Sequence, residues 1–200
     1  MARDGRVTFA TVNRAAMSLG TDLRAYIEQA SGASQPRDAT HLRNQELIMK
    51  TATMGGWTAL PESALDRDAR TSRAADVLLQ RRLEYAITEV WDWFDDVGAA
   101  LRDWDRRLDA LERYAIARLG REVERGEHLE LPMISGCWVV RATLRNRGLV
   151  AEHRHIFRAR FAGSGQAWLA ALTSPRPMPS RPALLWVSVD GRRLFPARLG

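Results

Sequence analysis

The chain has 200 residues, 46% of them apolar, which is enough to build the core of one ordinary domain. Its net charge of +6 favours an anionic partner, nucleic acid first, and Lys50 is the only lysine among 30 basic residues. No apolar run approaches the roughly 18 residues that span a bilayer, and the N-terminus lacks the apolar segment of a signal peptide. Cys137 is the only cysteine, which excludes an intrachain disulfide, and it reads as a buried small hydrophobe. The sequence therefore predicts a cytoplasmic protein with no membrane partner.

Two segments are predicted along the chain. Residues 1–38 are expected to hold one amphipathic helix and a linker, because Leu19, Leu23 and Ile27 repeat every four residues before "SGASQPRDAT" breaks the pattern. Residues 39–200 are expected to form one α/β domain.

The first half of this domain predicts a helix, three strands and a second helix. The first helix runs from Thr40 to about Met54, and "WTALPE", "RAADVLL" and "EYAITEV" are typical of strands, the last two in a hairpin. A helix over residues 95–118, capped by Asp95 or Asp96, follows from an apolar stripe at four- and three-residue spacing. The stripe consists of Val97, Leu101, Trp104, Leu108, Leu111 and Ala115.

The second half predicts a further strand, two helices and a hairpin. "ISGCWVVRAT" is a near-continuous apolar run, which is typical of a strand covered on both faces. Asn146 is expected to cap the next helix, and "GQAWLAAL" is expected to form a short helix after it. Asp190-Gly191 is expected to form the turn of a C-terminal β-hairpin. The inner residues expected in the helix after Asn146 are Leu149, Val150, Ile156 and Phe157. A helix between two strands indicates a crossover, so the prediction is a mixed sheet flanked by helices.

Two acids are expected to meet at the end of the central hairpin. Glu89 and Trp91 point to the same face of their strand, and pairing of the hairpin brings Asp76 close to Glu89. Two converging carboxylates suit Mg²⁺, which takes oxygen ligands and keeps waters for a substrate phosphate. A phosphodiesterase site also needs a cation to hold the attacking water, and the uncharged indole of Trp91 cannot supply it.

This arrangement resembles the PD-(D/E)XK, or restriction-endonuclease-like, superfamily, with its αβββαβ core, over roughly residues 41–161. The segments "RAADVLLQRRLEYAITEVWDWFDDVGAALRDWDRR", "CWVVRATLRNRGLVAEHRHIFRARFAGSGQAWLAAL" and "PALLWVSVDGRRLF" are also similar to a group of actinobacterial regulator-like proteins. In those proteins a Cro/C1-type helix-turn-helix precedes a restriction-endonuclease-like domain. The resemblance implies that Asp76 and Glu89 bind a metal ion, Mg²⁺ if the site is catalytic, and that Glu62 joins them as a third catalytic acid.

Arginines are the expected partners of the phosphate backbone. Relatives of the superfamily relocate the missing cation to a neighbouring helix, which implies Arg102, Arg106 or Arg107 here. A second set lies at spacings of seven and four residues on one predicted helical face, where it is either a solvated face or a phosphate-tracking stripe. This second set consists of Arg147, Arg154 and Arg158.

Three functional hypotheses follow. The first is a nucleic-acid-associated protein, DNA-binding and regulatory, with a degenerate Asp-Glu-x-Trp site, because arginine is a poor general base. The second is an active Mg²⁺-dependent endonuclease that uses Asp76 and Glu89. The third is a protein-interaction module, as a homodimer, in which Trp186 and Phe195 form an apolar patch.

Overall fold

The computed structural model describes residues 37–65, 74–94, 96–123 and 130–199, all within one compact unit, Gln35–Gly200. The predicted N-terminal helix and most of the linker lie outside the described residues. In the described part of the chain, none of the helices has both the length and the apolar character needed to cross a bilayer. The elements are α2 (Arg37–Thr53), β1 (Thr58–Ala64), β2 (Ala74–Arg81), β3 (Glu84–Trp91), α3 (Val97–Val123), β4 (Met133–Arg141), α4 (Leu144–Glu152), α5 (Arg154–Arg160), α6 (Gly165–Thr173), β5 (Ala183–Val187) and β6 (Leu194–Pro196).

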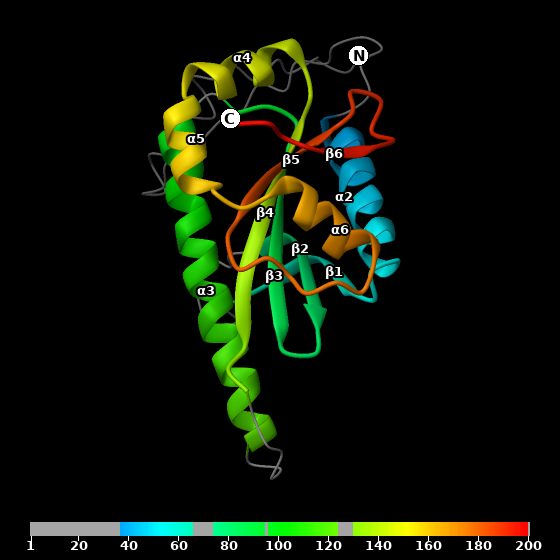
Figure 1. Ribbon diagram of the computed structural model, residues 1–200, viewed down its shortest axis with the longest axis vertical. Coiled ribbons are helices and arrows are strands. Elements are labelled where there is room, and N and C mark those ends of the chain that lie inside the picture. Colours follow the sequence, from blue (N-terminus) through cyan, green and yellow to red (C-terminus); the bar gives the residue numbers. More distant parts are fainter. Residues whose placement is uncertain (1–36, 66–73, 95, 124–129, 200) are drawn as a thin grey trace, which may run out of the picture. The chain divides into compact units, whose positions relative to one another are not determined.

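The six strands form one mixed sheet in the order β1-β2-β3-β4-β5-β6 (Figure 1). Strands β1, β2 and β3 are antiparallel, β3, β4 and β5 are parallel, and β6 returns antiparallel to β5. Helix α3 makes the crossover from β3 to β4, as expected for a helix between parallel strands. The predicted α/β fold, with a mixed sheet, flanking helices and a C-terminal hairpin, is confirmed. Membership of the restriction-endonuclease-like superfamily remains a prediction.

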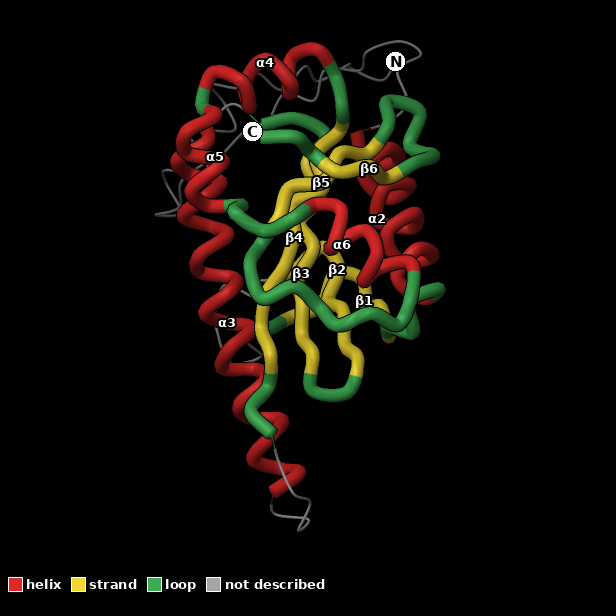
Figure 2. The backbone as a smooth tube through the Cα atoms, viewed as in Figure 1, coloured by secondary structure: helices red, strands yellow, loops and turns green. Residues whose placement is uncertain are grey.

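Helices cover both faces of the sheet (Figure 2). On one face, the apolar stripe of α3, including Leu101, Trp104 and Leu111, packs on Ile87 and Trp138. On the other face, apolar residues of α2 and α6 pack against β2, β4 and β5. Alternate strand residues therefore face different helices, which explains why β4 and β5 are nearly continuous apolar runs.

Several local predictions are also confirmed. Asp96 caps α3, since its Oδ1 accepts a hydrogen bond from the Ala99 N–H at 2.7 Å. Cys137 is fully buried, and burial raises the pKa of its thiol to about 12. A thiol held protonated in this way packs as a small apolar side chain and offers no nucleophile at neutral pH.

The predicted helix after β4 is in fact two helices, and its cap was wrong. Thr143, not Asn146, caps α4: the Thr143 Oγ1 accepts a hydrogen bond from the Asn146 N–H at 3.1 Å. The Asn146 side chain is buried instead and donates to the carbonyls of Asp92 at 2.9 Å and Arg141 at 2.8 Å. The chain then turns at His153, between α4 and α5. Asn146 therefore links the residue after β3 to the last residue of β4.

Gly136 lies where β4 passes close to β3 and to Trp104 of α3. A Cβ placed there would lie 2.4 Å from the Ile87 carbonyl oxygen and 2.6 Å from the ring of Trp104. Because a backbone oxygen cannot move aside without disturbing the parallel ladder, Gly136→Ala should lower the free energy of unfolding by about 3 kcal/mol, as overpacking does. Chemical denaturation will measure this loss. Gly120→Ala on α3 is the control: nothing lies within 4 Å of the added methyl group, so no loss is expected.

Candidate functional site

Asp76 and Glu89 lie at the end of the β2–β3 hairpin remote from its turn. In the antiparallel register, Val77 pairs with Thr88, and Asp76 and Glu89 are the next residues on the two strands. The Val90 N–H donates a hydrogen bond to the Asp76 Oδ2 at 2.7 Å, which fixes the carboxylate against β3. Asp76 is also close enough to Glu89 to raise the pKa of that carboxyl.

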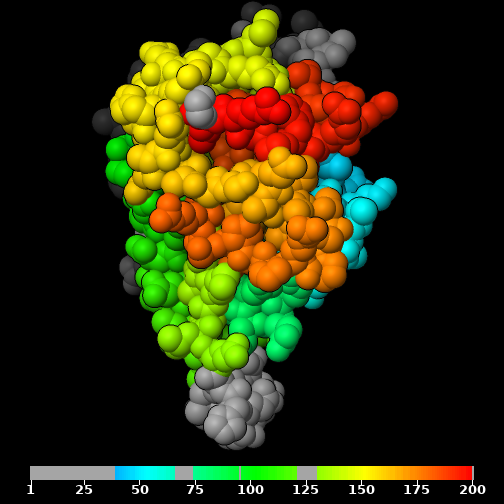
Figure 3. Space-filling model, viewed as in Figure 1, coloured from blue at the N-terminus to red at the C-terminus, as the bar shows by residue number. Residues whose placement is uncertain are grey.

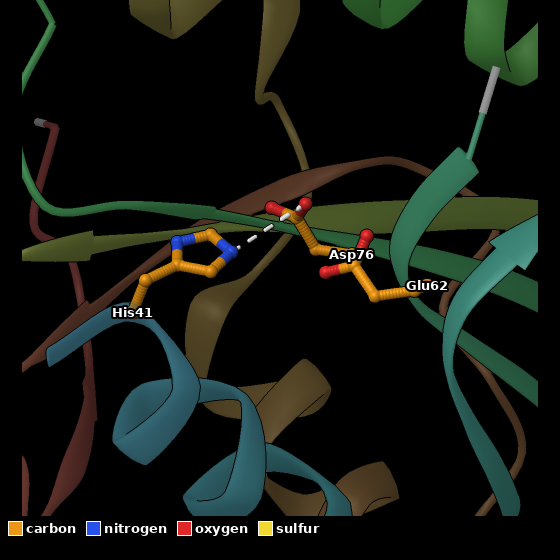
Figure 4. A group of neighbouring side chains, drawn as sticks. All are labelled: His41, Glu62 and Asp76. Atoms are coloured by element: carbon orange, nitrogen blue, oxygen red, sulfur yellow. Dashed lines mark ion pairs between the residues drawn. The ribbon is translucent and has the colours of Figure 1, made fainter. Parts of the chain in front are cut away.

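Two further side chains converge on Asp76. One ligand atom each from His41, Glu62 and Asp76 can be chosen so that all lie within 4.8 Å of one another (Figure 4). His41 comes from the first turns of α2, Glu62 from β1 and Asp76 from β2. Gln45, one turn after His41, donates to the Glu62 Oε1 at 2.6 Å and to the Asp76 carbonyl at 3.3 Å. We name His41, Glu62 and Asp76 the acidic cluster.

The backbone of Glu62 is in an unusual conformation. Its φ is 45°, in the left-handed region that costs a non-glycine residue about 1 kcal/mol. The register of β1 with β2 skips this residue: Pro61 pairs with Val77 and Ser63 with Ala75. Strained residues of this kind concentrate at binding and catalytic sites. Here the strained residue is one of the three members of the acidic cluster.

An arginine of α3, Arg107, forms an ion pair with Glu89. Its side chain is 2% exposed, and its Oε2 forms an ion pair with the Arg107 Nη1, whose side chain is 24% exposed. Burial, and after it the charge of Asp76, raises the pKa of Glu89 well above its usual value, whereas Arg107 opposes this shift. Its other oxygen, Oε1, is buried without a hydrogen-bond partner in the described part of the chain. Glu89 therefore has one oxygen in an ion pair and one buried oxygen without a hydrogen bond in that part of the chain.

Trp91 packs in the core beside the site. Its ring centroid lies 5.1 Å from that of Trp138 and 5.5 Å from that of Phe94. Edge-on and tilted contacts of this kind stabilise aromatic clusters. The residue at the position of the motif lysine is thus a packing residue, and the cation near Glu89 comes from α3 instead.

The other predicted arginines do not reach the acids. Of the set on α3, Arg102 is exposed and Arg106 forms an exposed ion pair with Asp103. The set after β4 is divided between α4 and α5, so it is not one helical stripe, although its members are all exposed. This set, Arg147, Arg154 and Arg158, lies along a groove described below. Trp186, expected in an exposed apolar patch, is 6% exposed, because it lies on β5 in the core.

His41 carries the clearest electrostatic signature of the cluster. The Asp76 carboxylate, whose Oδ1 lies 3.6 Å from the His41 Nε2, stabilises the protonated ring and raises its pKa above 6.5, more than burial lowers it. Because the pKa of His41 is higher in the folded than in the unfolded protein, the charged ring stabilises the fold. This stabilisation is fully present below about pH 6.5 and is lost as the pH rises through the pKa of His41 in the folded protein.

Asp76→Asn should therefore lower the pKa of His41, because it removes the charge that stabilises the imidazolium. NMR titration of the ring protons measures this shift directly. The stability lost between pH 6 and pH 8 should shrink in the same variant. His155→Asn, a substitution at an exposed position on α5, should leave the His41 titration unchanged. An equal effect of both substitutions would contradict the assignment.

Sequence reasoning missed His41, Asn44 and Gln45. Gln45 continues the buried side of α2 one turn before Ile48, and Asn44 and Gln45 are almost fully buried. The sequence signal that could have identified them is the pair Asn44 and Gln45, two polar residues that continue the buried side of a helix. Asn44 donates to the Asp92 Oδ1 at 2.8 Å, which links α2 to the end of β3.

The three side chains of the acidic cluster are of types that could hold a divalent metal ion. Carboxylate oxygens suit Mg²⁺ and Mn²⁺, and an imidazole nitrogen extends the range to first-row transition metals. Glu89 is not one of the three grouped ligands, and its second oxygen is buried. Three protein ligands would leave coordination positions open for water and for a phosphate oxygen.

Comparisons with protein-family models, curated proteins and solved structures give no match. The protein is therefore characterised by its fold class and by the side chains that its site brings together. It is an α/β protein with a six-stranded mixed sheet and a histidine-carboxylate cluster near an ion pair between the buried Glu89 and the partly exposed Arg107.

Proposed function

We propose that the chain is a nucleic-acid-associated protein with a restriction-endonuclease-like core, which binds DNA in a regulatory role. In this proposal the acidic cluster holds a divalent cation, and the cation contacts a phosphate of the DNA backbone. The observation that carries it is the convergence of His41, Glu62 and Asp76, from three separate elements, next to Glu89 and Arg107. The net charge of +6, supplied almost wholly by arginine, supports the same partner.

The Glu89 and Arg107 pair argues for binding without efficient cleavage. Arg107 can neutralise a phosphate charge, but it is protonated at any ordinary pH and cannot take a proton from water. Its ion pair also occupies one oxygen of Glu89 and lowers the charge available to a metal ion. Trp91, which packs in the core, offers no replacement.

A second candidate, the metal-dependent nuclease, is favoured by one observation. His41 adds a nitrogen ligand that becomes neutral as the pH rises, and Arg107 supplies a fixed positive charge beside the acids. A metal-bound water of lowered pKa would then need no separate lysine.

The test is DNA binding and cleavage with and without Mn²⁺. Fluorescence anisotropy with a duplex and a single strand, in EDTA and then in Mn²⁺, should show tighter binding by the wild type when Mn²⁺ is present. Glu62→Ala/Asp76→Ala should abolish this gain. The charge-matched control Asp109→Ala/Glu112→Ala, two exposed acids on α3, should retain it.

The outcomes separate the proposals. A wild type that binds neither DNA at low salt, with or without Mn²⁺, would overturn the proposed function. Plasmid cleavage by the wild type in Mn²⁺, abolished by Glu62→Ala/Asp76→Ala, would replace it with the nuclease.

A further inference from the structure

A groove of about 340 Å³ lies between α4, α5 and the chain that follows β6. Figure 3 shows the C-terminal segment, in red, lying beside α4 and α5, in yellow, on the surface of the molecule. Three arginines line the groove, Arg147, Arg154 and Arg198, around a floor that includes Trp186 and Leu199. No acidic residue lines it among the described residues. The groove is therefore cationic with an apolar floor.

Arg147 is held in place by aromatic rings. Its guanidinium carbon lies 5.2 Å from the centroid of Trp186 and 5.8 Å from that of Phe195, and its Nε donates to the Ala142 carbonyl at 3.3 Å. Cation–π contacts of this kind fix the guanidinium and reduce the entropy lost on binding an anion. Because Trp186 is buried and Arg147 lies over it, the ring is not open for stacking of a nucleobase.

A second cavity of about 470 Å³ continues the groove, because it shares Pro196, Arg198 and Leu199 with the first. It adds Arg158 and the residues at the start of α6, where Ser164 caps the helix. The positive end of the α6 dipole reinforces the charge of the arginines. Again no described acid lines the cavity. Arg198 thus stands between two positively charged hollows.

These arginines differ from those on the opposite side of α5 and on α3. Arg106 and Arg160 form ion pairs with Asp103 and Asp105. In the described part of the chain, no such pair involves the groove arginines, Arg147, Arg154, Arg158 and Arg198. Among the described residues, their charge is therefore available to a ligand without the breaking of an ion pair.

We infer that this groove, which we name the arginine groove, binds the phosphate backbone of a nucleic acid strand independently of its base sequence. The inference rests on the proposed function and adds a second contact, made without metal and from different elements than the acidic cluster. Guanidinium groups suit phosphate oxygens, that of Arg147 is already held in place, and the covered face of Trp186 is closed to stacking of a base. In the described part of the chain, four arginines without an ion pair line the groove and its continuation and no acid does, which favours a polyanion over a single carboxylate.

The test is the salt dependence of DNA binding in EDTA, where the acidic cluster holds no metal. Arg154→Gln/Arg198→Gln should weaken binding of a 20-base-pair duplex and should lower the slope of log Kd against log salt by about 2, one for each phosphate contact. The loss should be the same for duplexes of unrelated sequence. The control is Arg192→Gln/Arg193→Gln, which removes the same charge from exposed residues between β5 and β6.

Two outcomes would overturn the inference. If both double variants lose equal affinity and equal slope while the wild type binds DNA, the groove arginines act only through net charge, and the proposed function stands without the groove. If the wild type binds no DNA at low salt, the inference and the proposed function fail together. Circular dichroism and Mn²⁺ calorimetry on the groove variant should match the wild type, which shows that the fold and the acidic cluster are intact.

Discussion

Arg107→Ala should lower the free energy of unfolding by about 3 kcal/mol at neutral pH, because it leaves the Glu89 carboxylate buried without a counter-charge. Glu89 can escape this cost only by taking up a proton, and burial already raises its pKa. The folded state therefore gains stability from protonated Glu89 below about pH 4.5 and loses it as the pH rises through the folded value. The deficit of Arg107→Ala should shrink toward acid pH. Urea denaturation at pH 7.5 and pH 5 measures it.

The neighbouring residue provides the matched control. Arg106 is on the same helix, but its ion pair with Asp103 is about half exposed on both sides, so Arg106→Ala should change the stability by no more than about 0.5 kcal/mol. Equal losses at positions 106 and 107 would show that the pair of Arg107 with the buried Glu89 contributes nothing specific. Glu89→Gln/Arg107→Met, which removes both charges, should recover most of the loss.

Trp138→Ala should be the most destabilising core substitution near the site, at about 4 kcal/mol. Trp138 is fully buried on β4, and several aromatic rings surround it with centroids 4.9 to 6.3 Å away. These rings belong to Trp91, Phe94, Trp104, Phe157 and Phe161. Alanine would leave a cavity between α3, α5 and the sheet that these rigid rings cannot fill. Thermal and chemical denaturation will measure the loss.

Trp138→Phe is the informative comparison. It keeps an aromatic ring in the cluster and removes an indole N–H that is buried without a hydrogen-bond partner in the described part of the chain. We expect it to cost less than half as much as alanine. A cost equal to that of alanine would mean that the cluster does not depend on ring contacts.

Periodic and near-continuous apolar segments predicted the fold well. The stripe of α3 and the apolar runs of β4 and β5 are strong patterns, and the chain order then left few possible topologies. Asn146 shows where this reasoning fails. A cap and a buried amide have the same sequence signature, and only the position of Asp92 and Arg141 in space decides between them.

The candidate site was predictable in part. Strand alternation and hairpin pairing suffice to bring Asp76 beside Glu89. His41 was missed because it lies 35 residues before Asp76 in the chain, on a helix whose rotation about its axis the sequence does not specify. Arg107 contacts Glu89, whereas Arg102 and Arg106 do not. Which of the three does so depends on the rotation of α3 about its axis, which the sequence does not specify either. Arg198 lies in the irregular segment directly after β6, where the sequence has no periodic pattern.

The most direct test of the proposed cation site is calorimetric titration of Mn²⁺ into the wild-type protein and into Asp76→Asn. The proposal predicts one saturable site in the wild type, with an affinity that falls as the pH drops and His41 takes up a proton. Asp76→Asn should lose that binding at least 100-fold, whereas the exposed control Asp109→Asn should retain it. Equal binding by all three proteins, or no binding by the wild type, would contradict a metal site at His41, Glu62 and Asp76.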